Sequence, residues 1–335
     1  MTVTARADVQ DALDAINIRS ATCFSWFGDP SPKLRPGAFR AMDHSTKRDY
    51  LHHQIQARLY SDFYCKGAAT PGGGQRTTSR RTPTSPFIEE LSAANAGTGA
   101  REGGWSVVKV AGNVITVTRD GLQVWLTRDD AYAGEAENLS AGQPLAVRFP
   151  KELVKLSPGF YLALGNEGLP FEAGRDLVRF YWNLRAEDAP TLVKRTTQLL
   201  NEDRIPFRLK VLNDPSYYER CDAGVLYVQR SDYEKVVPAV RRVLTEIGGS
   251  LKNGTPVFTK VLAHGLGLAE EPAMSTDSFG MDRCRLLAEA VIRIHERSIV
   301  GAADRLAIVE AVFAEGGISF ATPYLNRGSA DGYRF

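Results

Sequence analysis

The sequence predicts an α+β protein, in which a mixed or antiparallel sheet is flanked by helices and preceded by helices and a β-meander. Residues 178–184 and 207–211 alternate between apolar and polar side chains, which is typical of strands with one buried face. Residues 188–201 and 231–247 carry apolar side chains at helical spacing. With a third apolar run at 223–228, the order is strand, helix, strand, strand, helix.

A length of 335 residues suggests two domains. We expect an N-terminal part over residues 1–150 and a second domain over residues 151–335. The N-terminal part begins with helices predicted at 7–18 and 45–64. A stretch rich in glycine, proline and threonine follows at about 66–86, and this composition predicts a flexible insert.

Three short runs of β-branched and aromatic residues lie between positions 107 and 126. The turn sequences Gly112-Asn113 and Asp120-Gly121 separate them, so they predict an antiparallel meander, to which residues 144–150 add a strand. Such a meander can present an edge to an extended peptide or to a partner protein. It can equally serve only to complete the sheet, and both interpretations stay open.

The composition excludes several classes of function. A net charge of +2 argues against a strongly basic nucleic-acid binder. The apolar runs are too short to span a bilayer, and the first residues lack a signal-peptide core, so we expect a cytoplasmic protein without a membrane partner. The four cysteines are isolated and no nucleotide fingerprint occurs, so we expect neither a metal nor an organic cofactor.

The polar side of the predicted strands is basic. Arg179 and Tyr181 share one face of the first strand, Arg208 and Lys210 share one face of the second, and Arg220 closely precedes the third. We call Arg179, Arg208, Lys210 and Arg220 the cationic cluster. Several convergent cations suit a phosphate group. A solvated sheet face would give the same alternation without any function, and that alternative also stays open.

Three further residues are candidates for the phosphate site, and each also has a structural explanation without function. Lys260 lies on a predicted strand and either reaches the phosphate or is a common edge-strand lysine. Arg283 opens a helix predicted at 282–297, where a basic residue opposes the helix dipole and suggests an anion, unless it is a surface arginine. His264 is either a proton donor or an incidental loop histidine.

Several of these segments, taken together, resemble the HopA effector family; they are residues 179–183, 206–211, 218–227, 258–260 and 278–285. Domains of that family occur in type III effectors. They also occur as stand-alone lyases in class V lanthipeptide and thioamitide biosynthesis, beside a separate kinase-like protein. The resemblance covers roughly residues 150–300.

A more distant similarity to OspF-type phosphothreonine lyases implies roles for individual residues. Lys210 falls on the base that removes the Cα proton, and Tyr227 on an active-site tyrosine. Arg179 and Arg220 fall on phosphate-binding residues. Arg208 is a plausible additional phosphate contact. Tyr181 stands where the OspF type has its general-acid histidine, which leaves the proton donor unassigned.

The resemblance therefore implies a lyase that eliminates phosphate from phosphoserine or phosphothreonine in a precursor peptide with a leader. The products are dehydroalanine or dehydrobutyrine, and a partner Ser/Thr kinase has to act first. Two other functions remain open. In the first, the chain is an effector-like module that binds phosphoproteins. In the second, it is a non-catalytic scaffold that delivers the peptide to a kinase.

Overall fold

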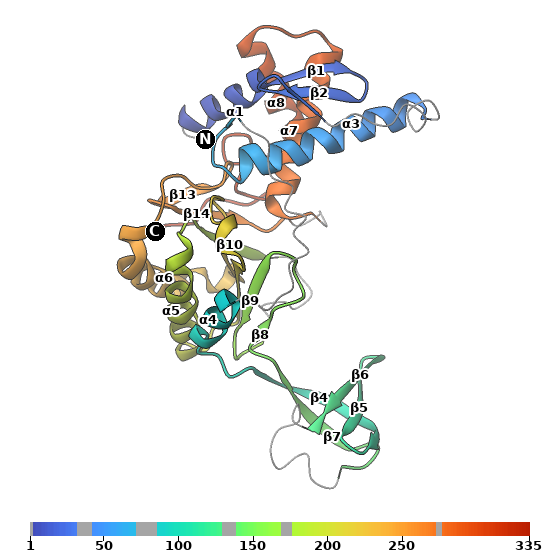
Figure 1. Ribbon diagram of the computed structural model, residues 1–335, viewed down its shortest axis with the longest axis vertical. Coiled ribbons are helices and arrows are strands. Elements are labelled where there is room, and N and C mark those ends of the chain that lie inside the picture. The colour runs from blue at the N-terminus through green and yellow to red at the C-terminus, as the bar shows by residue number, and fades with distance from the viewer. Residues whose placement is uncertain (1–2, 32–41, 72–85, 129–138, 169–175, 273–276) are drawn as a thin grey trace.

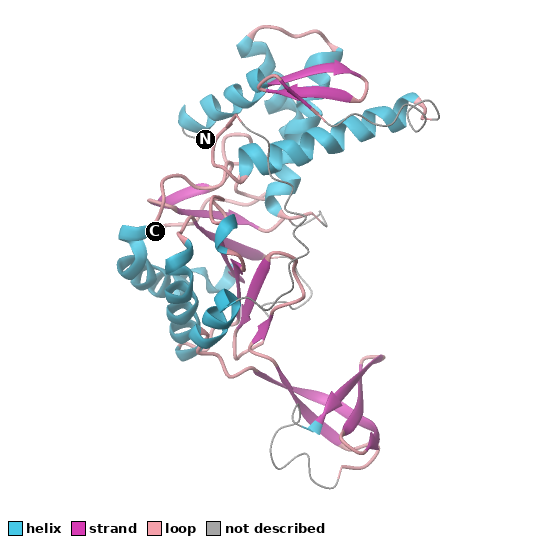
Figure 2. Cartoon of the chain, viewed as in Figure 1, coloured by secondary structure: helices cyan, strands magenta, loops and turns pink. Residues whose placement is uncertain are grey.

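The protein is described here by a computed structural model that covers residues 3–31, 42–71, 86–128, 139–168, 176–272 and 277–335. Antiparallel sheets and the helices around them make up this part of the chain (Figure 1). The predicted α+β class is confirmed. A seven-stranded sheet is central, a three-stranded sheet lies near the N-terminus, and a four-stranded sheet stands apart from both (Figure 2).

The central sheet has the strand order β13-β14-β10-β12-β11-β9-β8, and all neighbouring strands are antiparallel. The strands predicted from alternation, β10 and β11, both pair with β12, which lies between them. Side chains of three strands are therefore aligned on each face. The bounds are β8 (Glu152–Leu153), β9 (Phe160–Leu164), β10 (Leu177–Trp182), β11 (Phe207–Leu212), β12 (Gly224–Gln229), β13 (Lys260–Ala263) and β14 (Leu266–Glu270).

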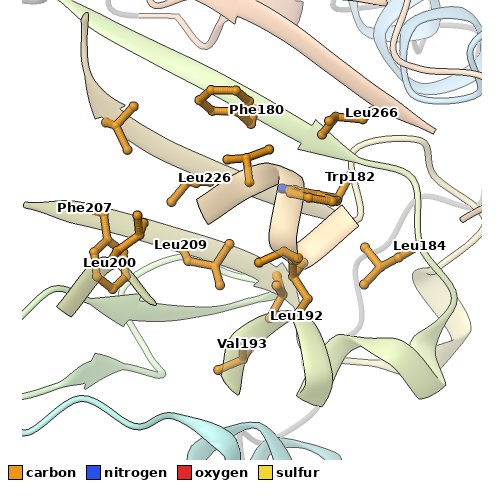
Figure 3. Close-up of a cluster of buried hydrophobic side chains, with 14 of the residues drawn as sticks. Phe180, Trp182, Leu184, Leu192, Val193, Leu200, Phe207, Leu209, Leu226 and Leu266 are labelled. Carbon is orange, nitrogen blue, oxygen red and sulfur yellow. The ribbon is translucent and has the colours of Figure 1, made fainter. Parts of the chain in front are cut away.

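One face of this sheet is covered by α4 (Pro86–Ala94), α5 (Ala189–Glu202) and α6 (Tyr233–Ile247). Figure 3 shows Phe180 and Trp182 among the apolar side chains that meet α5 there. Each such buried side chain stabilises the fold by about 1.5–3 kcal/mol. A Cβ atom on Gly224 would lie 2.8 Å from Leu192 of α5, so glycine in β12 lets the helix pack this closely.

The opposite face meets a second core, which combines residues from both ends of the chain. Here α3 (His44–Leu59) and the π-helix η1 (Tyr60–Tyr64) pack with α7 (Phe279–Glu296) and α8 (Ala302–Glu315). The remaining elements at this end are α1 (Val3–Ala15), β1 (Ile16–Ser20), β2 (Cys23–Trp26) and β3 (Asp29–Pro30). Short 3₁₀ turns occur at Ala186–Asp188, Pro215–Tyr217, Arg230–Asp232 and Gly248–Ser250.

The predicted boundary at residue 150 stays a prediction, but packing crosses it. Arg48 of α3 forms an ion pair with Glu289 of α7 at 2.9 Å, and apolar residues of both helices share one core. The N-terminal helices are therefore part of the body that holds the central sheet. The flexible insert predicted at about 66–86 falls mostly on residues 72–85, outside the described part of the chain.

Two local predictions need correction. The helix expected over 7–18 ends at Ala15, because Ile16 and Ile18 pair with β2 as a strand instead. The helix expected over 231–247 begins at Tyr233, with Asp232 as its N-cap residue, because a 3₁₀ turn occupies Arg230–Asp232.

The predicted meander is confirmed as a sheet of order β6-β5-β4-β7. Its strands are β4 (Ala100–Ala111), β5 (Val114–Arg119), β6 (Leu122–Thr127) and β7 (Pro144–Phe149). Asp120 and Gly121 both have positive φ, as a tight hairpin turn requires. The sheet has a small core of its own around Trp105 and Val117, and its edge strand β6 carries Trp125, which is 74% exposed.

Candidate active site

The register of the central sheet brings the predicted residues of three strands side by side. Arg179 of β10 lies opposite Tyr227 of β12, which in turn lies opposite Arg208 of β11. The guanidinium carbons of Arg179 and Arg208 are 4.9 Å and 4.1 Å from the centre of the Tyr227 ring. The tyrosine ring therefore interacts with two cations, and stacking holds both guanidiniums on the same face.

Lys210 lies in the next row of the same face. It opposes Val225 of β12, which opposes Tyr181 of β10. The Lys210 ammonium is 3.7 Å from the centre of the Phe160 ring of β9. The pKa of Lys210 is lowered to about 8, chiefly by burial. The three arginines of the cationic cluster act in the same direction, whereas the carboxylate of Asp222 opposes them.

Arg220 reaches this face from the loop before β12. Its Nε and Nη2 atoms donate to the two carboxylate oxygens of Asp222, each at 2.7 Å. Nη2 also donates to the hydroxyl of Tyr60 at 3.2 Å. These contacts fix the plane of the guanidinium and use three of its five N–H donors, so donors remain for a ligand.

Arg179 is anchored in a comparable way. Its Nε atom donates to Glu271, and its Nη1 atom donates to the hydroxyl of Tyr181 at 3.4 Å. Tyr181 also shares a hydrogen bond with Tyr64 of η1. Burial raises the pKa of Tyr181, so this hydroxyl stays neutral and can donate a hydrogen bond at physiological pH.

Sequence reasoning did not find Tyr60, Tyr64, Asp222, Glu271 or Phe160. The two tyrosines come from the N-terminal part, and only the packing of α3 and η1 on the sheet brings them to β10 and Arg220. Asp222 follows Arg220 by two residues and was visible in the sequence, but its role as a bidentate partner depends on the loop geometry. A π-helix is rare and frequently marks a functional site.

The structure places Lys260 on the other face of the sheet. Lys260 pairs with Leu268, and Leu268 pairs with Phe180, which belongs to the apolar face under α5 and α6. The Lys260 ammonium bonds to the Asp331 carboxylate at 2.7 Å and to the carbonyl oxygen of Tyr333. Lys260 therefore does not join the cationic cluster and holds the C-terminal segment instead.

The structure also shows that Arg283 does not lie at a helix start, where an anion-binding role was predicted. The helix begins at Phe279 with Ser278 as its N-cap, so Arg283 lies more than a turn inside α7 and is only 1% exposed. Its guanidinium pairs with Asp282 and donates to the backbone carbonyls of Pro323, at 2.7 Å, and Leu325, at 3.1 Å. These partners make Arg283 a buried clamp on the C-terminal segment, and we leave it out of the site.

A further sequence candidate, His264, lies outside the cluster. His264 is exposed in the turn between β13 and β14, where its ring contacts the carbonyl of Leu251 at 3.0 Å. Within the described ranges, no group of three or more His, Cys, Asp or Glu side chains is arranged to hold a metal ion.

The model of the HopA1 effector protein family matches residues 152–325, which is more than half of the 335-residue chain. The chain belongs to this family. The match includes every strand of the central sheet and all residues of the cationic cluster. No curated protein sequence matches the chain.

Two solved effector structures share the fold of this HopA1 family member. The effector protein from Pseudomonas syringae pv. tomato strain DC3000 has 15% sequence identity and a TM-score of 0.52, and 98% of each chain is covered. The effector from Pseudomonas syringae pv. syringae strain 61 has 14% identity and a TM-score of 0.51, with 97% of this chain and 98% of that one covered. The shared fold therefore extends beyond the family match into the N-terminal part.

Within the HopA1 match, Gly280 is predicted to be intolerant of substitution. A Cβ atom at this position would lie 2.3 Å from the ring of Tyr64, which is buried and packed between elements. Gly280→Ala should lower the free energy of unfolding by about 1–3 kcal/mol through overpacking, as measured by chemical denaturation. Gly249→Ala is the control because its Cβ would meet open space. Equal stabilities of the two variants would contradict the packing described here.

None of the described helices of this HopA1 family member combines the length and apolar character needed to cross a bilayer.

Proposed function

We propose that the chain is a cytoplasmic, cofactor-independent lyase that eliminates phosphate from phosphoserine or phosphothreonine in a precursor peptide. The reaction leaves dehydroalanine or dehydrobutyrine, and a partner Ser/Thr kinase phosphorylates the peptide beforehand. The observation that carries the proposal is the placement of Lys210, with its pKa lowered to about 8, on one sheet face with Arg179, Arg208 and Arg220. Membership of the HopA1 family is consistent with this proposal but does not define the substrate.

The proposed elimination begins at the Cα–H bond of the phosphorylated residue. Neutral Lys210 accepts the Cα proton, and the electron pair of the broken bond forms the Cα=Cβ double bond. As this double bond forms, the Cβ–O bond breaks and its electron pair leaves with the phosphate. A lysine serves as a base only when it is neutral, and the lowered pKa makes about a tenth of it neutral at pH 7.

The arginines act on the leaving group in this proposal. Arg179 and Arg220 are oriented by Glu271 and Asp222, and Arg208 is held by stacking on Tyr227. Preorganised cations lower the barrier because they stabilise the charge that develops on the leaving oxygen. Phosphate is mostly a dianion near neutral pH. A hydrogen bond from Tyr181, rather than full protonation, is then sufficient assistance.

The meander supplies a candidate place for the leader of the peptide. Among the described strands, β6 lies at the end of this sheet beside β5, and Leu122–Thr127 contains no charged residue and no proline. An extended peptide can add to such an edge through main-chain hydrogen bonds. We propose that the leader binds there while the phosphorylated residue lies at the cationic cluster.

The direct test is mass spectrometry of a leader-containing peptide, carrying phosphoserine or phosphothreonine, after incubation with the protein. The proposal expects a product lighter by one phosphoric acid. An intact phosphopeptide that binds with an affinity dependent on Arg179 and Arg220 would favour the phosphoprotein-binding module instead. A peptide that is neither bound nor converted, with the candidate kinase present, would refute a phosphate site.

The pH dependence of the reaction is predicted to follow Lys210. The base is active when deprotonated, so kcat/KM should rise with pH through about 8 and level off above it. Between pH 7 and pH 9 the neutral fraction of a group with this pKa increases about tenfold. In Arg208→Gln one repelling charge is lost, so the midpoint should move to higher pH. A flat profile from pH 6 to pH 10 would exclude Lys210 as the base.

A further inference from the structure

Two tyrosines outside the family match contact residues of the proposed phosphate site. Tyr60 and Tyr64 form the ends of η1, whereas the HopA1 match begins at residue 152. Their rings stack on each other, with centroids 5.4 Å apart and an angle of 14° between the planes. A π-helix places the two phenols one turn apart on one side, which is how both reach the same face of the sheet.

The first contact concerns Arg220. The Tyr60 hydroxyl accepts from Nη2 of Arg220 at 3.2 Å, on the guanidinium that Asp222 holds from the other side. Burial keeps the pKa of Tyr60 well above its usual range, so the hydroxyl remains a neutral acceptor. A neutral acceptor orients the guanidinium without cancelling its charge, and the charge stays available to an anion.

The second contact concerns Tyr181. Tyr64 is buried against Tyr60, Phe279 and the backbone at Gly280, and its hydroxyl is hydrogen-bonded to Tyr181. Arg179 donates to the same Tyr181 oxygen. Two hydrogen-bond partners on its oxygen hold the Tyr181 hydroxyl in one position. Tyr64 therefore helps to fix where this hydroxyl lies.

We infer that Tyr60 and Tyr64 are positioning residues that complete the phosphate site, Tyr60 by holding Arg220 and Tyr64 by fixing the position of the Tyr181 hydroxyl. The inference rests on the proposed function and extends the site into the N-terminal part of the chain. Tyr60 acts on the binding of the phosphate through Arg220. Tyr64 acts on the departure of the phosphate through Tyr181.

The test compares Tyr60→Phe, Tyr64→Phe and the control Tyr50→Phe in elimination kinetics with the full-length protein and a synthetic phosphopeptide. Each change removes one hydroxyl and keeps the ring, and Tyr50 lies on α3 about 15 Å before Tyr60. Tyr60→Phe should raise KM by about 5- to 10-fold, since the lost bond involves a charged group, with kcat nearly unchanged. Tyr64→Phe should lower kcat about fivefold with KM nearly unchanged. Tyr50→Phe should match the wild type.

The outcomes separate the inference from the proposed function. Equal KM and kcat for all three variants, with elimination by the wild type intact, would overturn the inference and leave the function standing. If the wild type binds the phosphopeptide without eliminating phosphate, the inference is tested by phosphopeptide affinity alone. A roughly 5- to 10-fold lower affinity of Tyr60→Phe supports the inference. An affinity equal to that of the wild type overturns it. A wild type that neither eliminates nor binds overturns both.

Discussion

Replacement of Lys210 by methionine is expected to abolish elimination while the phosphopeptide still binds. A positioned base contributes about 10²–10⁴-fold to a proton transfer. The arginines cannot replace the lost base because they stay protonated, and burial raises the pKa of Tyr181, so its hydroxyl stays neutral. Binding should persist because all three arginines of the cationic cluster keep their anchoring contacts. Single-turnover kinetics and a binding titration measure the two effects separately.

Two further variants sharpen this prediction. Lys210→Arg should be as inactive as Lys210→Met, because a guanidinium cannot lose its proton near neutral pH. Lys194→Met is the matched control, since Lys194 is exposed on α5, on the far side of the sheet from the cluster. A Lys210→Met rate within tenfold of the wild type would place the base elsewhere.

The second large effect is one of stability and concerns Arg283. In Arg283→Met the carboxylate of Asp282 loses a buried partner, and the carbonyls of Pro323 and Leu325 lose their donors. Breaking a buried ion pair on one side costs about 3–5 kcal/mol, so the free energy of unfolding should fall by this amount. Chemical denaturation measures the loss. Phosphopeptide affinity per folded molecule should change little, because the hydrogen bonds of Arg283 run to Asp282 and to the C-terminal segment rather than to the cationic cluster.

An exposed arginine provides the comparison. Arg297→Met, at the end of α7, should change the free energy of unfolding by about 0.5 kcal/mol or less. A stable Arg283→Met protein with weakened phosphopeptide binding would restore Arg283 to the phosphate site that its position in the sequence first suggested.

The alternation of polar and apolar residues was sufficient to predict β10, β11 and the face that carries Arg179 and Lys210. The face of Lys260 was not predictable in this way. β13 is short, and the side to which its residues point depends on its pairing with β14, which a single strand does not encode. A wrong helix start misled the interpretation of Arg283. With Ser278 as the N-cap, the first turn ends before Arg283, so the dipole argument does not apply to this residue.

The N-terminal contribution to the site could not be predicted from the sequence. Tyr60 and Tyr64 have the spacing of ordinary core residues on a helix, and nothing local distinguishes them. Their contacts with Arg220 and Tyr181 arise because α3 packs along α7, an interaction between segments more than 200 residues apart. Long-range packing of this kind depends on the whole fold rather than on a local pattern.

The geometry of the meander has a consequence for how proteins with this fold can diversify. Ala100 and Phe149 are paired neighbours in β4 and β7, so the chain leaves the body and returns to it at almost one point. Paired Cα atoms in antiparallel strands are about 4.5–5.5 Å apart, a gap that a tight turn closes. The intervening segment can therefore be excised or exchanged between relatives as a cassette. Under the proposed function, peptide choice and the chemistry at Lys210 can then evolve separately.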